Sequence, residues 1–239
     1  MEQLWLQCNE WRLHLDQSCL PLLGSYAELL ATYPLANVIG AKEIEHIILD
    51  HLLDSLSCLT VDQMARAESM VDVGTGGGLP GVPLAIARPE LSVTLLEATE
   101  RKARFLEEVR TRLGLKNVEV VQVRAEELGG MLEYRDSFGL ATARAVATLP
   151  VVLEYCAPLV RIGGHAISMK AQLHEEELSA GIRASTKLGV QLREIHEVHY
   201  RAPLPRKERR LVVFDKVTET PRAFPRRVGL AKKRPLGTF

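Results

Sequence analysis

The feature that most constrains the fold is a glycine-rich segment that follows directly on a short apolar stretch at residues 70–73. The apolar stretch predicts a buried strand. Glycines at positions 74, 76, 77 and 78 permit positive φ angles and let a ligand approach the backbone closely. Pro80 and Pro83 suit the first turn of a helix. The segment therefore predicts a strand, a tight turn and a helix start, an arrangement typical of nucleotide-type sites.

Two ligands compete for this turn. The glycines Gly76, Gly78 and Gly81 fit the dinucleotide fingerprint, with Glu97 placed to hold a ribose. Alternatively, Asp72 followed by V-G-x-G-x-G fits a Rossmann-like methyltransferase that binds S-adenosylmethionine. Carboxylates at positions 72 and 97 suit a cationic, hydroxyl-bearing ligand better than a pyrophosphate. We therefore favour the methyl donor over a dinucleotide or a turn without a ligand.

Composition sets the broad class. Of the 239 residues, 46% are hydrophobic and 25% are charged, as in ordinary globular proteins. No uncharged run approaches the ~18 residues of a membrane span, and the first residues lack the features of a signal peptide. The four cysteines form no close pair, which argues against a zinc site or a disulfide framework. We expect a cytoplasmic protein with no metal and no membrane contact.

The zero net charge hides a basic C-terminal part. Residues 201–239 hold twelve Lys or Arg and three Asp or Glu. Such asymmetry predicts contact with a nucleic acid, with a merely solvated tail as the alternative. Prolines and glycines in the tail indicate a loop laid on a surface. The candidate RNA-binding residues are Arg209, Arg210, Arg226, Arg227, Lys232 and Lys233.

The rest of the chain alternates between strand-like and helix-like segments. Residues 1–68 are predicted to be helical and to pack on a core at 69–217, with a basic tail at 218–239. Strands are predicted near residues 70–73, 92–96, 118–123, 138–142, 165–169, 190–200 and 209–217. The last two favour an antiparallel pair at a sheet edge. This pattern predicts an α/β fold with a doubly wound, mostly parallel seven-stranded sheet.

Polar residues follow the predicted strands where each one ends, and open α/β sheets bind ligands at that edge. Glu97 is placed to bind ribose hydroxyls, and the pair Ala125 and Glu126 to contact adenine. Arg144 and Lys170 end the next two strands. Each of these residues also has a plain structural alternative, such as a surface acid or a salt-bridge partner.

His51 lies on an apolar stripe of a helix predicted at residues 42–59. Asp54, three residues later, is close enough to hold its imidazole. A half-buried structural histidine is the alternative to a functional one.

Several motifs together resemble the glucose-inhibited division protein B family. They are D-V-G-T-G-G-G-L-P-G-V-P-L-A-I, H-L-L-D-S-L, R-A-E-E-L, R-A-V-A-T-L-P and P-R-R-V-G, spread over residues 37–236. The resemblance implies a class I methyltransferase that uses S-adenosylmethionine to modify guanine N7 in the decoding-region hairpin (the 530 loop) of 16S rRNA. The sequence departs from the family at residues 37–39 and 230–231. The resemblance places the cofactor at Gly74, Leu79, Glu97, Ala98, Thr99, Ala125, Glu126 and Arg144. The glycine pattern itself adds Asp72, Gly76 and Gly78.

The implied reaction needs no general base, because guanine N7 carries a lone pair and no proton. Arg144 and Lys170 would orient the guanine O6 or a phosphate, with His51 near the methyl-transfer pocket. The expected partner is 16S rRNA or the small ribosomal subunit, with no obligate protein partner. The alternatives are a methyltransferase of the same fold acting on a protein or metabolite, a nicotinamide oxidoreductase without an evident Tyr-x-x-x-Lys pair, and a non-enzymatic RNA-binding module.

Overall fold

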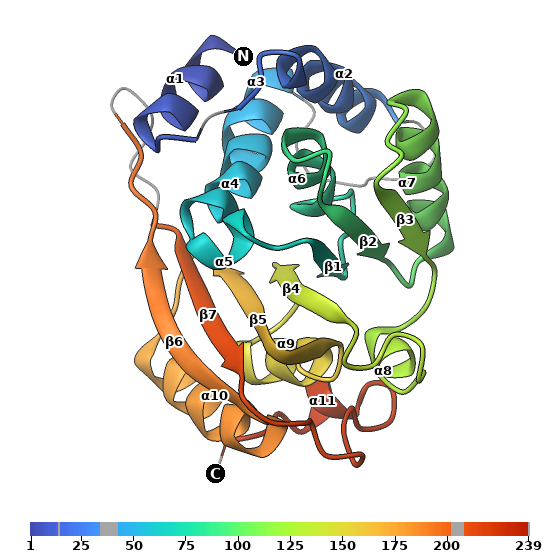
Figure 1. The fold of residues 1–239 in the computed structure, drawn as a ribbon, viewed down its shortest axis with the longest axis vertical. Helices are drawn as coiled ribbons and strands as arrows, with labels where there is room; N and C mark the ends of the chain where they lie inside the picture. The colour runs from blue at the N-terminus through green and yellow to red at the C-terminus, as the bar shows by residue number, and fades with distance from the viewer. Residues whose placement is uncertain (14, 34–42, 202–207, 239) are drawn as a thin grey trace.

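A computed structural model describes residues 1–13, 15–33, 43–201 and 208–238. One seven-stranded sheet has the order β3-β2-β1-β4-β5-β7-β6, in which β1 to β5 are parallel and β7 is antiparallel to both of its neighbours (Figure 1). The predicted doubly wound, mostly parallel sheet is confirmed. The strands are β1 Ser69–Val73, β2 Ser92–Leu96, β3 Val118–Val121, β4 Phe138–Arg144, β5 Val160–Lys170, β6 Val190–Glu197 and β7 Arg210–Lys216.

Helices cover both faces of the sheet (Figure 1). One apolar core joins the N-terminal helices, α6 and α7 to one face, and a second joins α8 to α11 to the other. The central strands are apolar and buried on both sides, as parallel strands require. The longer helices are α1 Glu2–Glu10, α2 Cys19–Thr32, α6 Gly81–Ala87, α7 Glu100–Arg112, α9 Leu149–Cys156 and α10 Glu175–Leu188, and the short ones are α5 Asp62–Ala65, α8 Ala125–Leu128 and α11 Leu230–Lys233.

The segment predicted as one helix at 42–59 is built differently. It runs through α3 (Ile44–His46), a π-helical turn (Ile47–Leu52), α4 (Leu53–Leu56) and a 3-10 turn (Ser57–Thr60). The wider π turn shifts the side chains around the helix axis. Ile44, at the start of this segment, is exposed, whereas Leu52 and Leu56 are fully buried.

The sequence pattern predicts a helix at 149–160, a turn at Gly163 and Gly164 and a strand from residue 165. In the structure α9 ends at Cys156 and β5 already begins at Val160. Gly163 and Gly164 lie inside β5, where its register with β4 shifts between Phe138 and Leu140. A Cβ on Gly164 would lie 2.6 Å from the Gly139 carbonyl oxygen, so the two backbones approach too closely for a side chain. The glycines thus mark an irregularity within a strand and not the turn before it.

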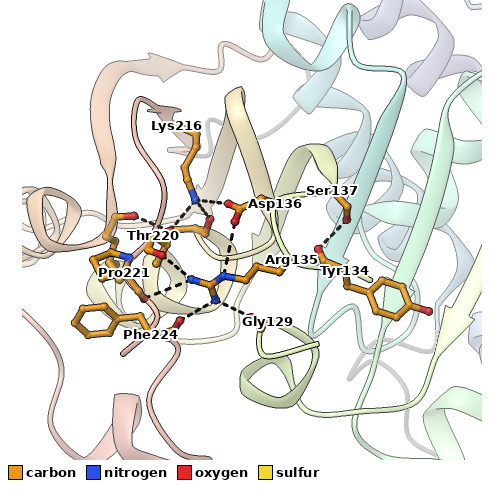
Figure 2. A network of polar contacts seen from close by, with 11 residues as sticks. Gly129, Tyr134, Arg135, Asp136, Ser137, Lys216, Thr220, Pro221 and Phe224 are labelled. Carbon is orange, nitrogen blue, oxygen red and sulfur yellow. Dashed lines mark hydrogen bonds and ion pairs between the residues drawn. The ribbon is translucent and has the colours of Figure 1, made fainter. Parts of the chain in front are cut away.

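The C-terminal tail is tied to the body of the protein by a network around Arg135 and Lys216 (Figure 2). Arg135 donates to the carbonyl oxygens of Gly129, Thr220 and Phe224 at 2.6–2.9 Å. Lys216 is fully buried, and its Nζ contacts Asp136 Oδ1 at 3.0 Å and Thr220 Oγ1 at 2.7 Å. Burial lowers the pKa of Lys216. The tail therefore starts from a fixed point.

Candidate functional site

The glycine-rich turn connects β1 to α6 in a conformation that only glycine adopts readily. Gly74, Gly76 and Gly78 have φ angles of +68°, +62° and +95°. A Cβ on Gly78 would lie 2.6 Å from Val82 Cγ2 and 2.8 Å from the Tyr26 hydroxyl. Tyr26, on α2, also donates a hydrogen bond to the Gly77 carbonyl oxygen. The N-terminal helices therefore support the turn from behind.

Asp72 ties the two ends of this turn together. It is fully buried, and its Oδ2 accepts hydrogen bonds from Thr75 Oγ1 at 2.6 Å and from the Gly81 N–H at 2.8 Å. Burial raises its pKa to about 6, although these hydrogen bonds oppose the shift. Its Oδ1 is buried and has no hydrogen-bond partner among the residues that the structure describes. The sequence predicted a cofactor contact here, and the structure adds a role in shaping the turn.

Glu97, at the end of β2, reaches across to the same turn. Its Oε2 accepts the Gly76 N–H at 3.0 Å and its Oε1 accepts the Thr99 N–H at 2.7 Å. Ala98 and Thr99 follow it before α7 begins at Glu100. Each carboxylate oxygen keeps a second lone pair, so ribose hydroxyls remain chemically suitable donors. Buried carboxylates beside a glycine turn fit a cationic, hydroxyl-bearing group such as S-adenosylmethionine.

The adenine-side pair stands at the start of α8. Glu126 is buried, and its Oε1 accepts the backbone N–H of Gly229 in the tail at 2.9 Å. Its carboxylate thus anchors the tail to α8, beside the proposed adenine contacts. Ala125 and the backbone of Glu126 remain the proposed adenine contacts.

A cavity of about 800 Å³ lies at the carboxyl ends of β4 and β5. A Cβ on Gly74 would lie 3.0 Å from Val146 Cγ2, so the segment after β4 packs directly on the glycine turn. The cavity therefore lies next to the proposed cofactor position. The predicted residues His51, Arg144, Lys170 and Arg209 line it, together with Asp50 and Asp54.

A buried carboxylate holds two of these cations. Asp54 Oδ2 pairs with Arg144 Nη1 at 3.0 Å, and its Oδ1 pairs with Arg209 Nε at 2.8 Å. Arg144 Nη2 also lies 3.2 Å from His51 Nδ1. The sequence placed Asp54 as a support for His51, whereas these contacts make it a support for arginines. Its partners are 90 and 155 residues away, beyond the reach of any local pattern.

Lys170 is fixed at the wall of the cavity. Its Nζ lies 2.8 Å from the Ala147 carbonyl oxygen and 2.7 Å from Glu177 Oε1. The same Glu177 oxygen accepts the N–H of Leu149 at the start of α9. Lys170 is therefore held between β5, α9 and α10, which fixes its ammonium group at the wall of the cavity.

The candidate RNA-binding residues fall into separate groups. Arg210 pairs with Glu197 and Glu208. Arg226 binds fully buried Glu154 through its backbone N–H, Nε and Nη2 at 2.6–3.0 Å. Within the described chain, the exposed residues Arg227, Lys232 and Lys233 form no ion pair. Arg226 thus holds the tail in place, whereas the other three remain available to a polyanion.

The remaining predictions concern metal sites, membrane spans, cysteines and residues 37–39. Among residues 1–13, 15–33, 43–201 and 208–238, no cluster of His, Cys, Asp or Glu could hold a metal ion. No helix in those ranges is long and apolar enough to cross a bilayer. The four cysteines are free and buried. The family departure at 37–39 lies outside the described residues.

Two solved structures with a similar fold are those of methyltransferases. The antibiotic-resistance methyltransferase Kmr is 19% identical, with a TM-score of 0.53, and the match covers 64% of this chain and 88% of that one. The mitomycin 7-O-methyltransferase MmcR is 17% identical, with a TM-score of 0.55, over 70% of this chain and 54% of that one. At such low identity these matches support the class I methyltransferase fold alone.

Two relatives found by sequence have a higher identity to this chain than these two structures. Ribosomal RNA small subunit methyltransferase G of Rubrobacter xylanophilus is 46% identical over 234 residues, covering 96% of this chain and 88% of the relative. The protein of that name from a Thermoanaerobacter species is 34% identical, covering 99% and 98%. The profile of the family described as GidB, rRNA small subunit methyltransferase G, matches residues 20–211. The resemblance drawn from the sequence motifs is thus confirmed, and the chain belongs to the GidB family.

Proposed function

We propose that this protein methylates N7 of a guanine in the decoding-region hairpin of 16S rRNA. Members of the GidB family are methyltransferases, and the methyl donor is S-adenosylmethionine. The single observation that carries the proposal is the cavity at the ends of β4 and β5, which adjoins the glycine turn and is lined by Arg144 and Arg209. It offers an acceptor nucleotide a place beside the donor.

The proposed reaction requires no proton transfer by the protein. A bond forms between guanine N7 and the donated methyl carbon while the carbon–sulfur bond breaks, so positive charge passes from sulfur to the purine. Guanine N7 loses no proton, and His51 is therefore not needed as a base. The residues of the pocket act by orientation and electrostatics. Asp54 and Glu177 keep Arg144 and Lys170 in place as donors toward O6 or a phosphate.

Access to N7 requires an exposed base. The major groove of A-form RNA is deep and narrow, so the target guanine lies in a loop or is flipped out of its stack. The tail residues Arg227, Lys232 and Lys233 would track neighbouring phosphates. The substrate is 16S rRNA or the small ribosomal subunit, which places the protein in the cytoplasm.

Methyl transfer with the modified base mapped tests this proposal. Labelled S-adenosylmethionine is supplied with deproteinised 16S rRNA or with small subunits that lack the modification. We expect label in the small-subunit RNA and strand cleavage by borohydride and aniline at one guanine. Labelling of another base, or of a ribosomal protein, would contradict the assignment. Cofactor binding without transfer to either substrate would redirect the search to metabolites.

A further inference from the structure

Asp54 divides its carboxylate between two arginines from separate parts of the sheet. Oδ2 pairs with Arg144, the last residue of β4, and Oδ1 pairs with Arg209, which directly precedes β7. Because β7 runs antiparallel to β5, its start lies at the edge where the parallel strands end. One side chain therefore sets the spacing between two cations across the mouth of the cavity.

The position of Asp54 is itself fixed. Its neighbours Leu53 and Leu56 are fully buried in the core, and Ser57 Oγ donates to its carbonyl oxygen at 2.6 Å. The Asp54 side chain is only 8% exposed. Burial and the nearby Asp54 carboxylate raise the pKa of Tyr200, which places that ring beside the same group. Because the Asp54 carboxylate is fixed in position, it can orient the guanidinium groups of Arg144 and Arg209 as well as balance their charge.

The two arginines face different parts of the site. The segment after Arg144 packs on the glycine turn, so Arg144 lies on the cofactor side. Arg209 lines the cavity with 22% of its side chain exposed. Its Nε is bound to Asp54 and its Nη1 to the Glu208 carbonyl oxygen. Within the described chain its Nη2 has no hydrogen-bond partner, which leaves two N–H donors for a ligand in the cavity.

We propose that Asp54 is a positioning residue for the substrate RNA. It holds the Arg209 guanidinium so that Nη2 donates to a phosphate oxygen next to the target nucleotide, and it keeps Arg144 at the cofactor side. This inference rests on the proposed function. Guanidinium and phosphate match in geometry, and a fixed guanidinium loses less side-chain entropy on binding than a free one.

The test separates positioning from simple structural support through four variants. Asp54→Asn removes the carboxylate charge, Arg209→Ala removes the guanidinium, and the third variant combines both changes. Arg209→Lys keeps the positive charge but lacks the Nε contact with Asp54. The matched control is Asp62→Asn, because Asp62 pairs with Arg66 on the surface, where both side chains are about 80% exposed.

Binding of deproteinised 16S rRNA is measured across a salt series, together with kcat, KM, cofactor affinity and thermal stability. We expect Asp54→Asn and Arg209→Lys each to weaken RNA binding about tenfold and to lower the salt slope by about 0.7, the value of one phosphate contact. The loss of RNA affinity in the double variant is expected to be smaller than the product of the losses in Asp54→Asn and Arg209→Ala, because Asp54 acts in part through Arg209. Asp62→Asn is expected to match the wild type.

Three results would overturn the inference: multiplying effects in the double variant, Arg209→Lys binding like the wild type, or Asp54→Asn losing only thermal stability. If Asp54→Asn fails to fold, the RNA affinity of Arg209→Lys still tests the inference. If the proposed function is wrong, the wild-type protein transfers no methyl group to the RNA. RNA-binding differences among the variants would still decide the role of Asp54.

Discussion

Glu126 accepts a hydrogen bond from the backbone N–H of Gly229, 103 residues further along the chain, at 2.9 Å. The contact joins α8, at the proposed adenine side of the cofactor, to the basic tail. Arg135 and Arg226 anchor the same tail through Phe224 and Glu154. The tail is therefore joined to α8, to α9 and to the segment before β4.

Glu126→Ala is expected to release this part of the tail. A hydrogen bond to a charged acceptor contributes about 1.5–3 kcal/mol, so amide hydrogen exchange at Gly229 should accelerate roughly ten- to a hundredfold. Hydrogen exchange followed by NMR or mass spectrometry measures this directly. The control is Glu127→Ala, which removes a carboxylate that binds the Arg124 N–H on the same helix. Unchanged exchange at Gly229 in the Glu126 variant would disprove the anchoring role.

Gly78 and Gly114 provide a matched pair for the glycine turn. Both have positive φ angles, +95° and +64°, but only Gly78 is crowded, with Val82 and Tyr26 around the missing Cβ. Alanine at either position meets backbone strain of about 1–2 kcal/mol. At Gly78 overpacking adds about 1–3 kcal/mol.

We therefore expect Gly78→Ala to lose more unfolding free energy in urea than Gly114→Ala, and it alone to lose affinity for S-adenosylmethionine. Calorimetric titration measures that affinity. Equal losses of stability and affinity in the two variants would show that the crowding around Gly78 has no consequence.

Asp72 makes stability depend on pH. Its pKa in the folded protein is about 6, above the ordinary value of 3.8. The stability that its protonated form contributes is thus complete below about pH 4 and is lost as the pH rises through 6. Asn cannot ionise, and its amide oxygen can keep the contacts with Thr75 and Gly81. Relative to the wild type, Asp72→Asn should gain up to about 3 kcal/mol of unfolding free energy between pH 4 and pH 7.

Urea unfolding of both proteins at four pH values checks this expectation. A difference in unfolding free energy that stays constant from pH 4 to pH 7 would mean that Asp72 titrates normally in the folded protein.

The basic tail should separate into structural and RNA-binding residues. Arg226→Ala leaves the buried Glu154 carboxylate unpaired and should cost about 3–5 kcal/mol of unfolding free energy. Combined alanine substitution of Arg227, Lys232 and Lys233 should change stability little, because all three are exposed. It should instead lower the salt slope of RNA binding by about two. A slope equal to that of the wild type would exclude the tail as an RNA contact.

The sequence predicted those parts of the fold that depend on local pattern. The apolar run before Gly74, the alternation of strands and helices and the antiparallel pair β6–β7 all follow from spacing and composition. The start of β5 did not, because Gly163 and Gly164 look like a turn. Only the close approach of Gly139 shows why a strand needs glycine there.

The site was predictable as a set of strand-end residues but not as a network. Arg144 and Lys170 end β4 and β5 as predicted, whereas their carboxylate partners come from α4 and α10. Arg226 resembled the other basic residues of the tail until its buried partner Glu154 was known. Long-range pairing of charges is set by tertiary packing, and no sequence spacing encodes it.

The most direct test of the account replaces one atom of the substrate. A 16S rRNA carrying 7-deazaguanine at the mapped position presents C–H in place of N7 and keeps O6 and the phosphates unchanged. Single-turnover transfer from labelled S-adenosylmethionine is compared with that on the unmodified RNA, alongside binding of each RNA. We predict that the two RNAs bind within about threefold of each other, since each phosphate contact is kept, and that no methyl group is transferred to the deaza substrate. Label on the deaza RNA would contradict guanine N7 as the acceptor.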